Sequence, residues 1–223
     1  RRGVEASLLQ TTVETLQAAL GWYDAALELD PDYAAALAGK CWAFVDLYPE
    51  TDDAQYIDAA EQACRRALQL NPNLDVVHTA LGELYMATGR HGRAEESFAA
   101  AHAIDPNSVA ALTGLGNVAR LQRRPEEAEK WLRQAIGLHP GDWSAYNSLG
   151  FFLYRSGRYA EAAREYEYVV GLDRDNSVGW GNLAASYMLG GDFESALSTY
   201  QRALEVEPRQ AIYSNLGLMY YYL

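Results

Sequence analysis

Hydrophobic positions between residues 75 and 106 form two helical stripes separated by a break. The first stripe places apolar or small side chains at i, i+3, i+4 and i+7, along one face of a helix. Its members are His78, Leu81, Gly82 and Tyr85. Gly89 ends this helix, and a second stripe (Ala94, Phe98 and Ala101) runs until Asp105-Pro106 stops it. Two short helices cannot bury both stripes alone, so the pattern predicts a helical pair that needs neighbours.

The same pattern recurs along the chain with a fixed period. Pro72, Pro106 and Pro140 lie 34 residues apart. Three other positions keep this period: a Leu-Gly slot, a small residue and a large residue. They read Leu81-Gly82, Leu115-Gly116, Leu149-Gly150 and Leu183-Ala184; Ala94, Ala128, Ala162 and Ala196; and Phe98, Leu132, Tyr166 and Tyr200. Four units in register indicate a repeat protein.

The order Leu-Gly, Tyr, Ala, Phe, Ala and Pro resembles the tetratricopeptide repeat (TPR) family. The resemblance implies an all-α fold, a right-handed α–α superhelix or TPR solenoid, with about five full repeats and a half repeat at each end. We expect one solenoid domain over residues 1–223. Its predicted parts are a partial repeat 1–33, a longer repeat 34–74, repeats 75–108, 109–142, 143–176 and 177–209, and a truncated half repeat 210–223.

The predicted repeat 34–74 has seven residues more than the period. The surplus lies in the turn-rich stretch Tyr48–Asp53, which we expect to form an inserted loop, 48–53, after a helix Ala34–Leu47. Side-chain oxygens just after the repeat boundaries are expected to cap the following helices. These residues are Asp32, Asn73, Asn107 and Asn176.

Composition and charge exclude several partners. The formal net charge is −12 and the pI is about 4.7, which argues against nucleic acid because phosphate binding needs clustered Lys and Arg. The sequence has no apolar run of about 18 residues, so we expect no membrane contact by this segment. Its first residue, Arg1, and its last helical pattern suggest a piece of a longer protein. The ends therefore leave the compartment unknown; a cytoplasmic location is favoured, with a periplasmic one as the alternative if a signal or anchor was removed.

The sequence predicts no enzyme, no cofactor and no metal. His78, His91, His102 and His139 occupy different repeat positions and form no i, i+4 pair. There is no Gly-rich phosphate loop, CxxC or nucleophile motif.

Function is therefore expected on a surface, and the TPR resemblance implies that the first helices line a concave groove. We expect a protein or peptide ligand there, because amide side chains both donate to and accept from a peptide backbone and apolar neighbours anchor side chains. The predicted groove residues are Trp42, Thr79, Glu83, Met86, Asn117, Arg120, Asn147, Phe151, Tyr154, Arg155, Asn182 and Asn215. The alternative is that the amides only keep this face soluble.

Two further resemblances narrow the partner. TPR domains that clamp a C-terminal carboxylate use Lys and Asn, but Thr79, Thr113 and Val76 occupy the expected lysine positions, which disfavours that function. Residues 12–72 resemble TPR regions appended to bacterial serine/threonine kinases, adenylate cyclases and winged-helix regulators. The alternative function is therefore a sensor or regulatory segment of a signalling protein that acts through self-association.

Three residues depart from the repeat pattern in repeat 34–74. Lys40 occupies the Leu slot, so we expect it to reach solvent or meet an acid. Cys41 and Cys64 occupy packing slots and are expected to be two buried thiols, with a disulfide as the alternative in an oxidising context.

The last predicted helix presents an open edge. Leu216, Tyr220 and Leu223 are expected to face water and to support homo-oligomer formation, either two-fold or head-to-tail.

Overall fold

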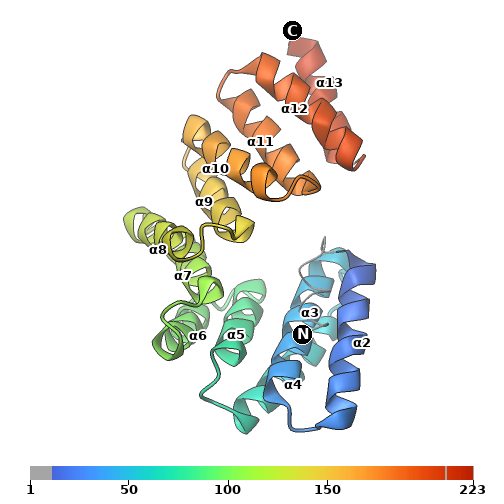
Figure 1. The fold of residues 1–223 in the computed structure, drawn as a ribbon, viewed down its shortest axis with the longest axis vertical. Helices are drawn as coiled ribbons and strands as arrows, with labels where there is room; N and C mark the ends of the chain where they lie inside the picture. Colours follow the sequence, from blue (N-terminus) through green and yellow to red (C-terminus); the bar gives the residue numbers. More distant parts are fainter. Residues whose placement is uncertain (1–11, 209, 223) are drawn as a thin grey trace. The chain divides into compact units, whose positions relative to one another are not determined.

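The structure is a computed structural model that describes residues 12–208 and 210–222, and these residues contain twelve α-helices and no strand (Figure 1). The helices are α2 (Val13–Leu29), α3 (Ala34–Thr51), α4 (Gln55–Leu70), α5 (Asp75–Ala87), α6 (His91–Ile104), α7 (Val109–Leu121), α8 (Pro125–Leu138), α9 (Trp143–Arg155), α10 (Tyr159–Leu172), α11 (Ser177–Leu189), α12 (Phe193–Val206) and α13 (Gln210–Tyr222). The all-α prediction is confirmed.

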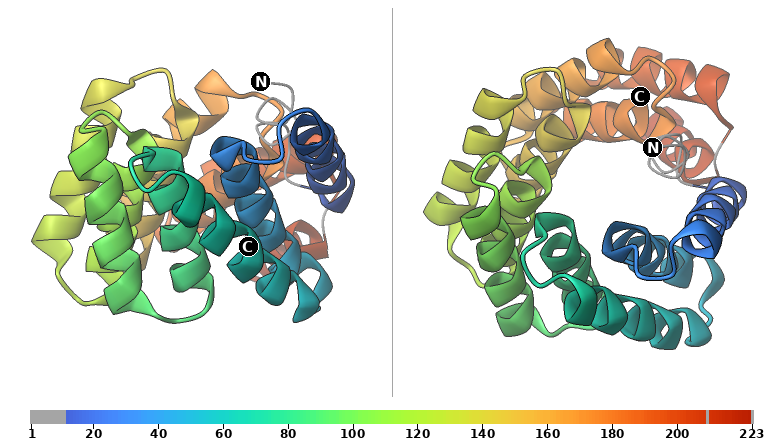
Figure 2. Two further views of the ribbon diagram at one scale, coloured as in Figure 1. Left: turned by 90° about the horizontal axis from the view of Figure 1, so that it is seen from below. Right: turned by 60° about the horizontal axis from the view of Figure 1, so that its bottom comes forward.

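The chain divides into two compact units, residues 1–123 and 124–223. In the first unit, α3 packs against α2, α4 and α5, and α5 packs against α6 and α7. In the second unit, each helix from α8 to α13 packs against the next, and Figure 2 shows α9 beside α10 and α11 beside α12. Helices that are consecutive in sequence are thus the principal packing partners, as expected for stacked helical hairpins.

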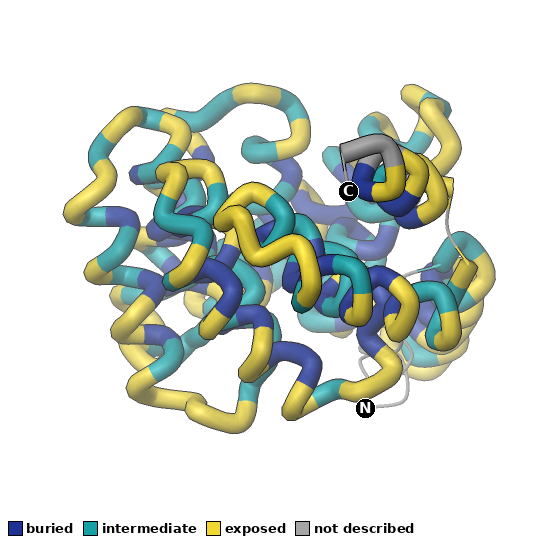
Figure 3. Tube along the Cα trace, turned by 90° about the horizontal axis from the view of Figure 1, so that it is seen from above, coloured by how far each residue is buried: buried dark blue, intermediate teal, exposed yellow. Residues whose placement is uncertain are grey.

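Small residues in the Leu-Gly slot allow close approach between the two helices of a repeat. A Cβ added at Gly82 would lie 2.5 Å from Phe98 Cε1, and one at Gly150 would lie 3.0 Å from Tyr166. Phe98 and Tyr166 are almost fully buried. Figure 3 shows that buried and exposed residues alternate along the helices. The glycine therefore lets the ring of the second helix lie directly on the backbone of the first.

The turn inside each repeat uses a left-handed residue at one repeat position. Gly89, Gly157 and Gly191 have φ values of 71°, 76° and 83°, and Arg123 has 60°. A left-handed residue with a side chain costs roughly 1–2 kcal/mol, which glycine avoids. The sequence therefore marks three of these turns with glycine and leaves the fourth unmarked.

The predicted inserted loop 48–53 was wrong, because α3 continues through Pro49 to Thr51. The break is confined to the residues around Asp52, which adopts the left-handed conformation with φ of 54° and donates its N–H to the Tyr48 carbonyl. Leu47 is fully buried with Leu16 of α2. The extra residues therefore lengthen a packed helix instead of forming a surface loop.

One of the four predicted caps is confirmed. Asn176 accepts a hydrogen bond from the Gly179 N–H at 2.8 Å, whereas α7 is capped by Ser108, and α3 and α5 have no side-chain cap. Asp32, Asn73 and Asn107 instead donate their backbone N–H groups to a side-chain oxygen two residues earlier. The acceptors are Asp30, Asn71 and Asp105. The intervening proline fixes a turn in which the preceding side chain is the acceptor.

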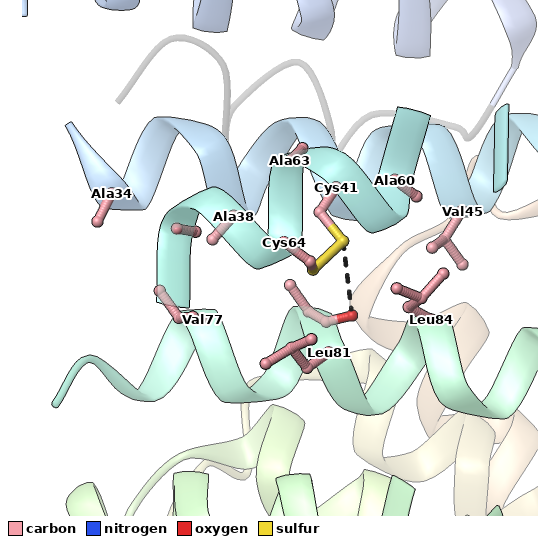
Figure 4. Packing of buried hydrophobic residues seen from close by; sticks show 12 residues of the cluster. Ala34, Ala38, Cys41, Val45, Ala60, Ala63, Cys64, Val77, Leu81 and Leu84 are labelled. Atoms are coloured by element: carbon pink, nitrogen blue, oxygen red, sulfur yellow. Dashed lines mark hydrogen bonds between the residues drawn. A yellow bond between two sulfur atoms is a disulfide. The ribbon is translucent and has the colours of Figure 1, made fainter. Parts of the chain in front are cut away.

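Cys41 and Cys64 form a disulfide, so the expectation of two buried thiols was wrong (Figure 4). The bond joins α3 to α4 with the Cα atoms 5.4 Å apart, in a core cluster that includes Val77 and Leu81 of α5. Cys41 Sγ lies 3.9 Å from the carbonyl oxygen of Ala80. The disulfide therefore lies where two repeats pack together.

Candidate functional site

Every predicted groove residue lies on the first helix of a repeat, and each is half-buried or exposed. The first unit contributes Trp42 on α3; Thr79, Glu83 and Met86 on α5; and Asn117 and Arg120 on α7. The second unit contributes Asn147, Phe151, Tyr154 and Arg155 on α9; Asn182 on α11; and Asn215 on α13. Each unit therefore has a face of its own that contains predicted groove residues.

Three of these residues meet at a cavity of about 370 Å³ in the first unit. It is lined by Tyr23, Ala35, Ala38, Gly39, Trp42, Val76, Thr79, Ala80, Glu83 and Ala110. Ligand pockets in proteins generally have volumes of roughly 300–1,000 Å³, so this cavity is large enough for a bulky side chain. Its lining is almost entirely apolar, with one carboxylate.

Small residues create this cavity. Ala35, Ala38 and Gly39 on α3 face Ala80 on α5 and Ala110 on α7, so no side chain fills the space between these helices. Gly39 is required beneath Tyr23, because a Cβ there would collide with the tyrosine ring. The periodic pattern marks such positions as packing slots, which is why sequence reasoning found Trp42, Thr79 and Glu83 but missed the small residues that line the cavity.

Two carboxylates lie together at the acidic side of the face. Burial raises the pKa of Glu83 to about 7, with a further contribution from the negative charge of Asp46. Burial also raises the pKa of Asp46 to about 6, and Glu50 adds to this effect. Ionisation of either carboxyl group is therefore unfavourable here, and a nearby cation would offset this cost.

Lys40 does not supply that cation. Its Nζ lies 2.5 Å from Asp24 Oδ1 on α2, and it lies 5.8 Å from the centre of the Phe44 ring. The prediction that Lys40 meets an acid is confirmed. Its charge is used to join α2 and α3.

The face of the second unit is richer in aromatic side chains. Phe151 is 40% exposed, and Tyr154 lies edge-on to Tyr159 with ring centres 5.6 Å apart. Burial and the neighbouring Tyr154 raise the pKa of Tyr200 to about 12 and also raise that of Tyr166. Both tyrosines are buried beneath this face, so they belong to its packed core.

A larger hollow of about 540 Å³ in the second unit is lined by a mixture of polar and apolar side chains. Trp180 donates its indole N–H to the Arg174 carbonyl at 2.9 Å. Tyr187 donates to Glu167 at 2.5 Å, and its pKa is raised to about 12, mainly by burial and by this hydrogen bond. Several polar groups of this hollow already have partners, which makes it a weaker candidate than the apolar cavity.

Within residues 12–208 and 210–222, no group of three or more His, Cys, Asp or Glu side chains is arranged to hold a metal ion. His78, one of the four histidines, places Nε2 2.7 Å from the Pro72 carbonyl oxygen, which gives it a structural partner. None of the helices in this part of the chain is long and apolar enough to cross a membrane.

The predicted self-association edge needs correction. Leu216 is only 8% exposed, because it packs with Ile212 and Met219 of α13 against α11 and α12. Tyr220, one helical turn after Leu216 at the edge of this stripe, is 63% exposed, while Leu223 lies outside the described residues. The helix therefore turns the stripe at residues 212, 216 and 219 inward.

Comparisons with known proteins identify the repeat. Two family models, both described as tetratricopeptide repeat, match residues 79–142 and 153–217. Among curated protein sequences, none matches this chain.

Solved structures share the fold at low sequence identity. PilF of Pseudomonas aeruginosa has a TM-score of 0.64 and 18% identity, covering 97% of this chain and 94% of its own. The Cut9–Hcn1 hetero-tetramer of the APC/C has a TM-score of 0.75 and 18% identity, covering 93% of this chain and 40% of its own. YrrB, described as a TPR protein with an unusual peptide-binding site, has a TM-score of 0.53 and 20% identity, covering 85% and 94%. These likenesses confirm the predicted fold class, an α–α repeat solenoid.

Proposed function

Because this chain belongs to the tetratricopeptide repeat proteins, we propose that its first unit binds an extended peptide or partner segment on the face formed by α3, α5 and α7. The TPR fold is that of protein–protein interaction modules and is typically a non-catalytic scaffold. One observation carries the proposal: the apolar cavity between Trp42, Val76 and Thr79 is open to a side chain from outside the molecule. YrrB, which shares the fold, is described as binding peptide.

The second unit is proposed to continue peptide binding on its own first helices. Asn147, Asn182 and Asn215 are half-buried, so each remains partly exposed to a ligand, and an amide can both donate and accept hydrogen bonds. Phe151 and Tyr154 would supply apolar anchors beside them.

The test is selection of a phage-displayed random dodecapeptide library on the immobilised protein. Thr79→Phe should fill the cavity and weaken the enriched peptides at least 10-fold. The matched control is Ala99→Phe, which adds the same ring at an exposed position of α6 and should leave binding unchanged. If enriched peptides bind both variants as well as they bind the original chain, the cavity is not the binding site.

The alternative function, a sensor or regulatory segment acting through self-association, has a separate observation in its favour. Tyr213 and Tyr220 are 53% and 63% exposed on one side of α13. Light scattering should then show an oligomer that Tyr213→Ser with Tyr220→Ser converts to a monomer. A monomer of the unaltered chain at high concentration would exclude this alternative.

A further inference from the structure

We infer that the segment bound by the first unit carries a Lys or Arg two residues from a bulky apolar side chain. The apolar side chain enters the cavity beside Trp42 and Thr79, and the basic group pairs with Glu83 and Asp46. This inference rests on the proposed function and specifies the chemistry of the ligand.

The acidic end of the cavity lacks a cation within the described residues. Glu83 lines the cavity, and Asp46 follows Trp42 by one helical turn on α3. Neither carboxylate has a hydrogen bond or ion pair with another described side chain, and the charges that act on them, Asp46 on Glu83 and Glu50 on Asp46, are negative. Carboxylates that lose water without gaining a partner are unfavourable, so a basic ligand group has a strong electrostatic preference for this end.

Three basic groups on the helices that pack against α5 have partners other than Glu83 and Asp46. Lys40 on α3 pairs with Asp24, and Arg66 on α4 pairs with Asp32. Arg90, at the start of α6, pairs with Glu61 of α4 at 2.5 Å. A cation for Glu83 and Asp46 is therefore expected from the ligand, which also suits a chain of net charge −12.

The spacing on the two helices determines the spacing in the ligand. Thr79 and Glu83 are one turn apart on α5, as are Trp42 and Asp46 on α3, and one helical turn rises about 5.4 Å. Side chains at alternate positions of an extended peptide point the same way and are separated by roughly 6.6 Å. The apolar and acidic parts of the site therefore match side chains at positions n and n+2, in either chain direction.

A neutral or acidic segment would fit less well. An apolar residue over Glu83 and Asp46 would remove water from both carboxylates without replacing its hydrogen bonds. An acidic residue would add repulsion. The cavity alone selects for size, and the carboxylates add the selection for charge.

The experiment uses peptides enriched on the original chain in the library selection described above. The prediction is that they share an apolar residue and a Lys or Arg two positions away. Replacing that Lys or Arg with norleucine should weaken binding at least 10-fold. On the double variant Glu83→Gln, Asp46→Asn, the same replacement should change affinity less than threefold, because the charge partner is gone. Glu96→Gln, at an exposed position of α6, is the control and should retain the full effect.

The possible failures are distinguishable. Circular dichroism first verifies that the variants are folded. Peptides that depend on the cavity, as shown by Thr79→Phe, but lack a basic residue or show no coupling to Glu83 and Asp46 would overturn this inference and leave the proposed function intact. Peptides that are insensitive to Thr79→Phe would overturn both.

Discussion

Repeats 34–74 and 75–108 solve one packing problem in two ways. In repeat 75–108, Gly82 on the first helix receives the ring of Phe98 from the second. The same repeat positions in 34–74 hold Cys41 and Cys64, which are joined by a disulfide. Both solutions bring the two helices close together at this point. The comparison shows that the repeat requires a short distance at this position and does not require a particular residue pair.

The two solutions differ in what maintains them. The ring contact depends on shape and is insensitive to redox conditions, whereas the disulfide persists in oxidising compartments and is rare in the reducing cytosol. The cross-linked form found here is therefore the form expected in an oxidising environment.

The largest expected effect is loss of the cross-link. Cys41→Ala with Cys64→Ala should lower the free energy of unfolding of the first unit by roughly 2–4 kcal/mol, because the unfolded chain regains the freedom that the disulfide removes. Urea unfolding followed by tryptophan fluorescence measures this loss. Reductant should lower the stability of the original chain similarly and should not affect the variant. An unfolding curve that reductant leaves unchanged would show that the cysteines are not bridged in solution.

The next largest effect is expected from the close contact between Gly82 and Phe98. Gly82→Ala should cost about 1–3 kcal/mol, because its Cβ would overlap Phe98 in a filled core. Gly21→Ala is the matched control, since Gly21 lies inside α2 with no atom near its added Cβ. The control should stabilise the chain by roughly 0.5–1 kcal/mol, through helix propensity. Equal effects of the two substitutions in thermal unfolding would mean that close approach is not the role of Gly82.

The dependence of stability on pH should distinguish repeat 75–108, which contains Glu83, from repeat 109–142. Asn117 occupies in the following repeat the position that Glu83 holds in 75–108, and it does not titrate. Because the pKa of Glu83 is raised to about 7 in the folded chain, the native state holds a proton that the unfolded state releases above about pH 4.5. Stability should therefore fall as pH rises from about 5 to 8.

Glu83→Gln tests this effect. The variant should be more stable than the original chain at pH 8 by about 1 kcal/mol, with the difference shrinking towards pH 5. Melting temperatures across this range give the comparison, and Glu96→Gln serves as the exposed control. A stability difference between the two proteins that grows as the pH falls would contradict a raised pKa of Glu83.

The smallest effect is expected on the face of the second unit. Asn147→Ala and Asn182→Ala should each change the free energy of unfolding by no more than about 0.5 kcal/mol, because neither side chain belongs to the buried contact between paired helices. Peptide affinity should nevertheless fall. Retained affinity in both variants, and also in Phe151→Ala and Tyr154→Ala, would remove the second unit from the proposed binding face.

The sequence predicted the features that depend on periodic burial. The helical pairs and the slots of Gly82, Phe98 and Tyr166 follow from spacing alone, because a repeated apolar face must be buried at each step. Leu216 also belongs to a repeated slot, but its exposure depended on which side of α13 faces its neighbour. The helix provides Ile212 and Met219 on the same side, a choice that the sequence pattern did not resolve.

Features that depend on three-dimensional neighbours were missed. Pro49 suggested a loop, yet α3 continues past this proline. Leu47 is buried in the core, and such tertiary packing overrides local propensity. The cavity arises from small residues on three helices, and the acidic pair Glu83 and Asp46 joins positions far apart in the chain. Neither leaves a local signal, although Glu83 itself was identified from its repeat position.

The disulfide also changes the connectivity of the chain around the break after α3. Asp52 and Ala54 are exposed there, and both lie between Cys41 and Cys64 in the sequence. A protease that cuts the backbone at this point would leave two fragments joined through sulfur. On a denaturing gel the two fragments would separate only after reduction. A cut between α3 and α4 would therefore leave the two parts of the chain covalently joined.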